Sequence, residues 1–454
     1  MLTDQDSRDP LQWLSRILWP DDATTICVDG PGEPRWWASP NTTSPKVLIP
    51  AGSAAAAKTA VRRYHDGFDV TRRARSAAAE LLTPAATPFG APLRRHQVAV
   101  HHRPGPGQQP PAPGVLDGIA DLLGIDDLHV AISLSTPKSN QKPVIQLLDG
   151  DGRCHGWAKV AWNDRTEALV ANEADWLRRT ARSPLSKPAL LHETTIAGRP
   201  VAISSTVTPS RVPRRRAATP PAAAVFRAVS ELGTAETVRL KESRWWLTVE
   251  SILEHATPRE RLAVQAAVDS CYGNEVLVGG WHGDLTPWNM MTTARRTHVI
   301  DWEFAADGAP FGFDLCHFHT QVASELRGLD AAAALDYSAR LAPHGLATLG
   351  VEPDNRTPVW RMYLVELIRR MVALRASGYP TDQITHGPAA LQRLERSQGA
   401  ILSSIRSTTV VTAPNPTEDG ITGEDGALER DASTVAAPPV PQRETIVGNG
   451  VDVL

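Results

Sequence analysis

One irregular segment of the chain holds polar residues whose types and spacing suit phosphoryl transfer. Asp284 is followed five residues later by Asn289, and Asp301 stands twelve residues further on, at the end of the apolar run HVI. Phosphoryl transfer needs a carboxylate that orients the attacking hydroxyl and accepts its proton. It also needs an amide oxygen and a second carboxylate that hold Mg²⁺ on the phosphates. Pro287 stiffens the short loop, so that Asp284 can face the acceptor while Asn289 turns to the metal.

The segment resembles the aminoglycoside phosphotransferase and choline kinase group of small-molecule kinases, which share the eukaryotic protein kinase-like fold. The resemblance covers about residues 120–400, and the residues that carry it are His282, Gly283, Asp284, Pro287, Asn289, Ile300, Asp301, Trp302, Glu303, Asp314 and Leu315. It implies that Asp284 is the catalytic base and that Asn289 and Asp301 bind Mg²⁺. Either of the two motifs, His282–Asp284 or Ile300–Glu303, has a simpler explanation when taken alone, because a loop Asp or Asn is usually a turn former or a cap. Their order and spacing together favour a kinase-like protein.

The upstream half offers an independent check, since this fold needs a lysine on its third strand paired with a glutamate on the next helix. Lys159 lies inside the apolar run WAKVA, and Glu173 falls on the apolar stripe of the following helix. Each charge would be costly to bury unless it is paired or holds a phosphate. Seen alone, either residue would be interpreted as a solvated surface charge. Their position before Asp284 favours a functional pair that binds the nucleotide.

The nucleotide loop departs from the protein kinase pattern, because no GxGxxG is present between the first two strands of this region. The segment Thr136–Pro143 reads TPKSNQKP. Ser139 and Asn140 could donate hydrogen bonds to phosphates, and Lys138 or Lys142 could add charge, although a lysine in a polar loop is ordinarily just solvated. The choice between ATP and GTP stays open. By family analogy alone, adenine is expected near residues 204–208.

The elements that must position these residues follow from local patterns. Strands are expected over 129–135, 143–149, 155–162, 190–198 and 199–207, and a helix is expected from Asp164, with Glu167 completing its cap. After Pro220 the chain is mostly helical, with one helix over 258–272 capped by Thr257 and another capped by Thr357. These elements and the resemblance predict an α+β, bilobal protein kinase-like fold. An antiparallel sheet with one helix would form the N-lobe, and a mainly helical C-lobe would follow.

Composition shifts divide the chain. We expect an N-terminal extension of unknown role (1–100), a Pro- and Gly-rich linker (101–115), the N-lobe (116–207), the helical C-lobe with the catalytic loop (208–406) and a disordered tail (407–454). The tail holds eight acids and two bases of a total of 50 acids and 47 bases, which leaves 42 acids and 45 bases elsewhere. A mildly basic body is therefore expected beside an acidic tail.

The overall composition excludes several classes of protein. The near balance of charge gives no reason to expect a nucleic-acid partner, and no run of eighteen apolar residues indicates a membrane span. The acidic start lacks the order of a signal peptide, and the four cysteines (Cys27, Cys154, Cys271, Cys316) form no CxxC pair. A soluble, cytoplasmic protein is expected.

The leading hypothesis is a kinase that transfers the γ-phosphate of ATP, or of GTP, to a hydroxyl of a small molecule with the help of Mg²⁺. A metabolite, a sugar, an amino-alcohol and an aminoglycoside-like acceptor all stay open, because the helices after Asp314 carry mixed charge. The first alternative is a catalytically weak, kinase-like binding or scaffold protein. The second is a metal-dependent hydrolase that uses His282, Asp284 and Asp301. Partners of the N-terminal extension and of the tail are unknown. The run Arg211, Arg214, Arg215 and Arg216 is interpreted first as a surface loop.

Overall fold

The computed structural model describes residues 9–20, 24–28, 34–65, 96–102, 113–134, 140–207, 220–271, 273, 275–292, 296–378 and 386–409. The described residues up to Glu395 form one compact unit, and a second unit begins at Arg396. The predicted tail from residue 407 lies outside the described residues, apart from the end of the last helix.

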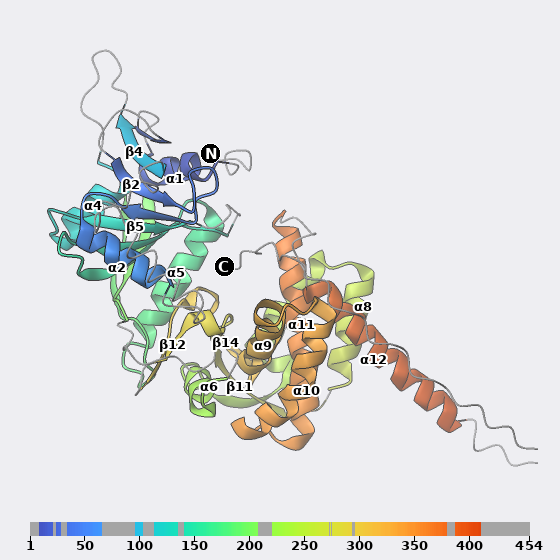
Figure 1. Cartoon of the computed structure of the whole chain (residues 1–454). Helices are drawn as coiled ribbons and strands as arrows, with labels where there is room; N and C mark the ends of the chain where they lie inside the picture. Colours follow the sequence, from blue (N-terminus) through green and yellow to red (C-terminus); the bar gives the residue numbers. More distant parts are fainter. Residues whose placement is uncertain are drawn as a thin grey trace, which may run out of the picture. The chain divides into compact units, whose positions relative to one another are not determined.

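A nine-stranded sheet organises the first half of the chain (Figure 1), and every neighbouring pair of its strands is antiparallel. In spatial order the strands are β1 (Thr24–Val28), β4 (Gln97–His102), β2 (Pro34–Ser39), β3 (Val47–Pro50), β5 (His129–Ser133), β6 (Val144–Leu148), β7 (Cys154–Val160), β9 (Arg199–Ser204) and β8 (Leu190–Ile196).

The N-terminal residues join the same sheet as the predicted kinase-like strands. Strand β3 pairs with β5, with Val47 opposite Ser133, so that the first segment extends the sheet at one side. Strand β4 runs across the boundary predicted after residue 100, and residues 103–112 of the predicted linker lie outside the described part. The division into an extension, a linker and an N-lobe remains a prediction.

Helices cover both faces of the sheet. Helices α1 (Pro10–Leu18) and α4 (Val115–Leu123) share one apolar core with strands β2, β5, β6, β7 and β9, whose buried side chains include Trp36, Ile132, Ile145 and Val160. Helix α2 (Ala54–His65) packs on β3 and β5, and α5 (Asp164–Arg179) packs on β7, β8 and β9. Helix α4 was not among the predicted elements. It is closed by Gly124, whose positive φ of 63° suits a helix end.

The N-cap of helix α5 lies one residue before the predicted cap. Asn163, not Asp164, is the N-cap, because its side chain accepts a hydrogen bond from the amide of Thr166 at 2.8 Å. The Thr166 hydroxyl accepts in return from the amide of Asn163 at 3.0 Å. Asp164 and Glu167 instead lie in the first turn, where their charges favour the helix dipole.

The second half of the chain is mainly helical, as predicted. Its helices are α6 (Ala223–Ser230), α7 (Arg244–Ile252), α8 (Pro258–Asp269), α9 (Phe313–Gln321), α10 (Ala331–Leu349), α11 (Pro353–Ala376) and α12 (His386–Thr409). A small antiparallel sheet combines β10 (Glu236–Arg239), β11 (Glu275–Trp281) and β14 (Ala306–Pro310). Strand β12 (Met290–Thr292) pairs antiparallel with β13 (Thr297–Val299). The expected α+β class, with a large antiparallel sheet followed by helices, is confirmed.

The two predicted helix starts have different outcomes. Thr257 caps α8 and Pro258 occupies its first position, as predicted. The start predicted at Thr357 is wrong, since α11 begins at Pro353 after Glu352, and Pro358 lies inside the helix. Either proline can open a helix, and the chain uses the earlier one. The middle of α11 is buried nearly all round, including Leu364, Leu367, Ile368 and Met371. Within the described residues, no helix has the length and apolarity that crossing a membrane requires.

Candidate active site

His282 links the two sequence motifs of the candidate site. Its Nε2 donates to the carbonyl of Ile300 at 2.9 Å, and its Nδ1 accepts from the amide of Asp284 at 3.2 Å. The imidazole is fully buried, and burial lowers its pKa to about 4. A neutral His282 with both nitrogens engaged therefore holds the loop that carries Asp284 beside the segment that carries Asp301.

Asp284 has both carboxylate oxygens oriented by neighbours. His317 Nε2 lies 3.0 Å from Oδ1, and Asn289 Nδ2 donates to Oδ2 at 2.9 Å. The same Asn289 nitrogen also donates to the Asp284 carbonyl at 2.9 Å, so that the amide oxygen of Asn289 is the atom suited to hold a cation. Burial raises the pKa of Asp284 to about 7, and the nearby negative charge of Asp301 adds to the shift. A carboxyl that titrates near neutrality suits a general base.

Asn289 is positioned by the short 3₁₀ turn Pro287–Asn289. Its amide N–H donates to the carbonyl of Thr286 at 3.1 Å, and its own carbonyl accepts from the amide of Ile300 at 3.0 Å. The second bond ties the Asn289 backbone to the residue before Asp301. This hydrogen bond places the backbone of Asn289 beside the residue that precedes Asp301, the other predicted metal ligand.

Asp301 adopts a left-handed backbone conformation, with φ 70° and ψ 62°, directly before the 3₁₀ turn Trp302–Phe304. Only glycine visits this region freely, although Asp tolerates it better than most residues. The conformation turns the Asp301 carboxylate to Lys159, with which it forms an ion pair. Burial alone would raise the pKa of Asp301, but Lys159 and Lys142 outweigh burial and lower it.

Lys159 of β7 and Glu173 of α5 form the ion pair that the sequence predicted. Lys159 also contacts Asp301, and its Nζ lies 3.1 Å from Glu303 Oε2. Burial alone would lower the pKa of Lys159, but the three carboxylates raise it well above its usual value. Burial raises the pKa of Glu173 against the opposing effect of Lys159. The lysine therefore stays charged and gathers three acids around it.

Two charged residues beyond the predicted set belong to this cluster. Glu303 follows Asp301 by two residues, and its carboxylate contacts both Lys159 and the buried Lys142. Lys142 was interpreted as a solvated loop lysine in the first instance, and that interpretation is wrong, because Glu303 draws it into the interior. Glu303 stood among the motif residues but was given no role, and its acidic side chain beside Asp301 was the available signal.

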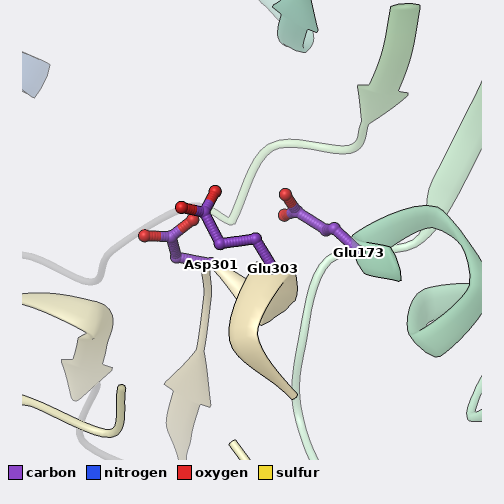
Figure 2. Close-up of side chains that lie close together, drawn as sticks. All are labelled: Glu173, Asp301 and Glu303. Carbon is purple, nitrogen blue, oxygen red and sulfur yellow. The ribbon is translucent and has the colours of Figure 1, made fainter. Parts of the chain in front are cut away.

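Three carboxylates converge in this cluster. Oxygens of Glu173, Asp301 and Glu303 all lie within 4.8 Å of one another. Figure 2 shows Glu173 reaching from α5 toward Glu303, which lies in the Trp302–Phe304 turn, and toward Asp301, which directly precedes that turn. Hard oxygen ligands of this kind fit Mg²⁺. Lys159 Nζ contacts all three carboxylates, and the amide oxygen of Asn289 is a further hard donor, so the chemistry of these residues fits the metal that the resemblance implied.

Helix α5 is fastened to the turn that follows Asp301. Asn172 donates to the carbonyls of Glu303 and Ala305 at 2.9 and 3.0 Å, and the rings of Trp176 and Trp302 stack with centroids 6.3 Å apart. These contacts flank Glu173 along the helix and hold it opposite Asp301 and Glu303. Trp302 is consequently a core residue here.

Asp314, in the first turn of α9, supports the loop before Asp284. Its two oxygens accept from the amides of His282 and Gly283 at 2.8 and 3.2 Å. Burial raises the pKa of Asp314 to about 7. Gly283 has a φ of 82°, and a Cβ atom there would stand 2.2 Å from the Phe304 carbonyl oxygen, so that the sharp turn needs glycine.

Arg370 anchors the same loop from α11. It donates to the Gly283 carbonyl at 2.7 Å and to the buried Glu366 at 2.8 Å, and its guanidinium lies over the ring of Trp281, 4.7 Å from the centroid. Burial alone would raise the pKa of Glu366, but Arg369 and Arg370 lower it to about 2. Trp281 thus packs under a cation beside the loop.

His317 was not predicted as a site residue. It lies one helical turn after Asp314 on α9, is buried, and bridges Asp284 to the hydroxyl of Tyr363, which stands 3.1 Å from Nδ1. Burial lowers the pKa of His317 to about 3, so that the ring is neutral at pH 7. Its position three residues after Asp314, on the same helix face, was the available sequence signal.

Most of the remaining predicted residues are not among those that the structure describes. Ser139, Lys138, the four arginines from Arg211 to Arg216 and Thr208 lie outside the described residues, and Asn140 is a half-buried turn residue. A cavity of about 570 Å³ lies elsewhere, between the end of α5 and the segment 183–190, and is lined by Arg178, Lys187 and Arg296 among others. Its lining includes none of the residues that carry the predicted chemistry.

Comparison with known proteins gives distant structural similarity only. No protein-family model and no curated protein matches the chain. A solved aminoglycoside phosphotransferase candidate from Ralstonia eutropha has 14% identity and a TM-score of 0.40, covering 60% of this chain and 93% of its own. A choline/ethanolamine kinase family protein from Mesorhizobium loti has 16% identity and a TM-score of 0.39, covering 58% and 87%. An aminoglycoside phosphotransferase from Alicyclobacillus acidocaldarius has 15% identity and a TM-score of 0.35, covering 67% and 99%.

Proposed function

We propose that this chain is a phosphotransferase that moves the γ-phosphate of ATP or GTP to an alcohol group of a small molecule. The observation that carries the proposal is the convergence of Lys159, Glu173 and Asp301 from three separate segments. Asp284 and Asn289 are hydrogen-bonded to each other in the adjoining loop, which His282 ties to Ile300. A surface charge cluster would not require a buried lysine with three acids, nor a carboxyl oriented through both oxygens.

Asp284 is the proposed base. Its carboxylate accepts the proton of the acceptor hydroxyl while the hydroxyl oxygen forms a bond to the γ-phosphorus. The bond between that phosphorus and the β,γ-bridging oxygen breaks, and the nucleoside diphosphate leaves with the bond electrons. Asn289 and His317 fix the direction of the Asp284 oxygens.

Asp301 and Asn289 are the proposed metal ligands. The carboxylates of Glu303 and Glu173 lie beside Asp301 and add negative charge there. Mg²⁺, when bound, neutralises charge on the phosphates. Lys159 is proposed to bind phosphate oxygens, and Glu173 holds its ammonium in place. Catalysis then depends on position and charge rather than on a covalent intermediate.

The acceptor is proposed by class only. A metabolite, a sugar, an amino-alcohol or an aminoglycoside-like molecule each carries the required hydroxyl. We also propose a cytoplasmic location, where nucleoside triphosphates are abundant, because all four cysteines (Cys27, Cys154, Cys271, Cys316) are free thiols.

A panel of metabolites and antibiotics, screened for nucleotide consumption, tests the proposal. Asp301→Asn is the blank, and Asp269→Asn is the matched control, because Asp269 is an exposed residue paired with Lys241. We expect Mg²⁺-dependent consumption with one acceptor class, absent in Asp301→Asn and kept in Asp269→Asn. Binding of nucleotide without any turnover across the panel would favour the weakly catalytic binding protein. Tight metal binding without nucleotide binding would favour the hydrolase.

A further inference from the structure

Lys142 is a buried cation for which the proposed mechanism has no role. The residue is 7% exposed and its Nζ contacts Glu303 Oε2. It lies two residues before Val144, which is the direct cross-strand partner of Lys159. Side chains two positions apart on an extended segment share a face, and direct partners on neighbouring strands also share one. Lys142 and Lys159 therefore reach the same Glu303 oxygen from one side of the sheet.

The two buried lysines, Lys142 and Lys159, need the neighbouring carboxylates to balance their charge. Glu173, Asp301 and Glu303 carry up to three negative charges against the two ammonium groups. Two lysines at one carboxylate repel each other, and the acids offset that repulsion. An ammonium that lost its carboxylate in this interior would be costly unless another anion replaced it.

Nucleotide phosphates are the anions that fit this position. The segment before Lys142 has no GxGxxG pattern, so that a cradle of glycine amides is not indicated there. A lysine serves phosphate as a point charge without the geometric demands of a backbone cradle. If Asp301 and Glu303 turn to a metal on the phosphates, Lys142 and Lys159 both need new partners at that place.

We propose that Lys142 is a second phosphate-binding lysine, held on Glu303 until the nucleotide takes over as its partner. The inference rests on the proposed nucleotide-binding function and deepens it. Glu303 competes with the phosphates for Lys142, so that the acid restrains nucleotide binding while no metal is present. A purely structural ion pair would have no such competition.

Calorimetric titration with ADP in excess EDTA tests the proposal, because the absence of metal separates lysine contacts from metal contacts. We expect Lys142→Met to weaken ADP binding by roughly tenfold or more, the scale of one charge-assisted hydrogen bond. We expect Glu303→Gln to strengthen it by releasing the lysines. Lys241→Met, which removes an exposed lysine paired with Asp269, should bind ADP like the unchanged protein.

The paired variant Lys142→Met/Glu303→Gln guards against loss of folding, since it removes both members of the ion pair together. It should bind ADP more weakly than Glu303→Gln alone. Equal affinities of those two variants, or an unchanged affinity in Lys142→Met, would overturn the role of Lys142 while leaving the proposed function intact. Failure of the unchanged protein to bind either ADP or Mg²⁺–ATP would instead contradict the proposed function itself.

Discussion

Nε2 of His317 lies 3.0 Å from Oδ1 of Asp284, and the opposite ring nitrogen of His317 lies 3.1 Å from the hydroxyl of Tyr363. The imidazole is buried and neutral at pH 7, since its pKa falls to about 3. It therefore acts on Asp284 as a hydrogen-bond donor of fixed direction and not as a counter-charge.

This contact predicts a difference between two variants of His317. His317→Gln keeps an N–H near the position of Nε2, whereas His317→Leu removes it. We expect His317→Leu to lower kcat by about ten- to hundredfold, with little change in nucleotide affinity, because the carboxylate loses a partner that orients it. His317→Gln should recover most of that loss. If His317 had a purely structural role, the two variants would have the same kcat when compared at temperatures equally far below their melting temperatures.

Asp284 predicts the pH dependence of turnover. Because its pKa is raised to about 7, the carboxyl is protonated at lower pH and cannot accept a proton. We expect kcat/KM to fall below pH 7, approaching tenfold per pH unit, in a profile measured between about pH 5 and 8. The pKa values of His282 and His317 are lowered to about 4 and about 3, so that neither contributes an inflection there. Asp314, whose pKa burial also raises to about 7, supports the loop before Asp284 and adds to the same inflection. A profile that stays level down to pH 5 would contradict the assignment of Asp284.

The raised pKa of Asp284 also predicts how the stability of the folded protein changes with pH. The pKa of Asp284 is higher in the folded protein than its ordinary value of 3.8, so its contribution to stability is present below that value and is lost as pH rises through about 7. Asp284→Asn removes this titration. In metal-free buffer, its melting temperature should rise relative to the unchanged protein between about pH 5 and 8.

Asp269→Asn is the control for that comparison. Lys241 lowers the pKa of Asp269, so the removal of Asp269 should produce no such rise. Burial also raises the pKa of Asp314 to about 7, and the charge of Asp284 adds to that shift, so Asp284→Asn lowers the pKa of Asp314 and part of the rise comes through Asp314. A difference between Asp284→Asn and the unchanged protein that stays constant with pH would refute the raised pKa.

Local sequence signals predicted the elements that local physics decides. Thr257 with Pro258 opens α8 as expected, because a cap and a proline act within one turn. The alternation of apolar residues identified β5, β6 and β7, and with them the place of Lys159. The errors in the predicted starts of α5 and α11 are local as well. Asn163 and Asp164 are both good caps, and Pro353 and Pro358 can both open a helix, so that neighbouring packing decides between them.

Contacts over long sequence distances could not be predicted in the same way. Lys142 has the sequence surroundings of a solvated loop, and only Glu303, far along the chain, makes it a buried residue. The bridge from His317 to Tyr363 joins two helices whose packing no periodic pattern specifies. The Lys159–Glu173 pair was predicted because the resemblance supplied the missing long-range information.

Calorimetric titration with ATP, with and without Mg²⁺, tests the central claim most directly. The proposed site predicts that Mg²⁺ tightens ATP binding to the unchanged protein and to Asp269→Asn, whereas Asp301→Asn loses the Mg²⁺-dependent gain because its metal ligand is gone. No binding at millimolar ATP, or an undiminished Mg²⁺-dependent gain in Asp301→Asn, would contradict the account.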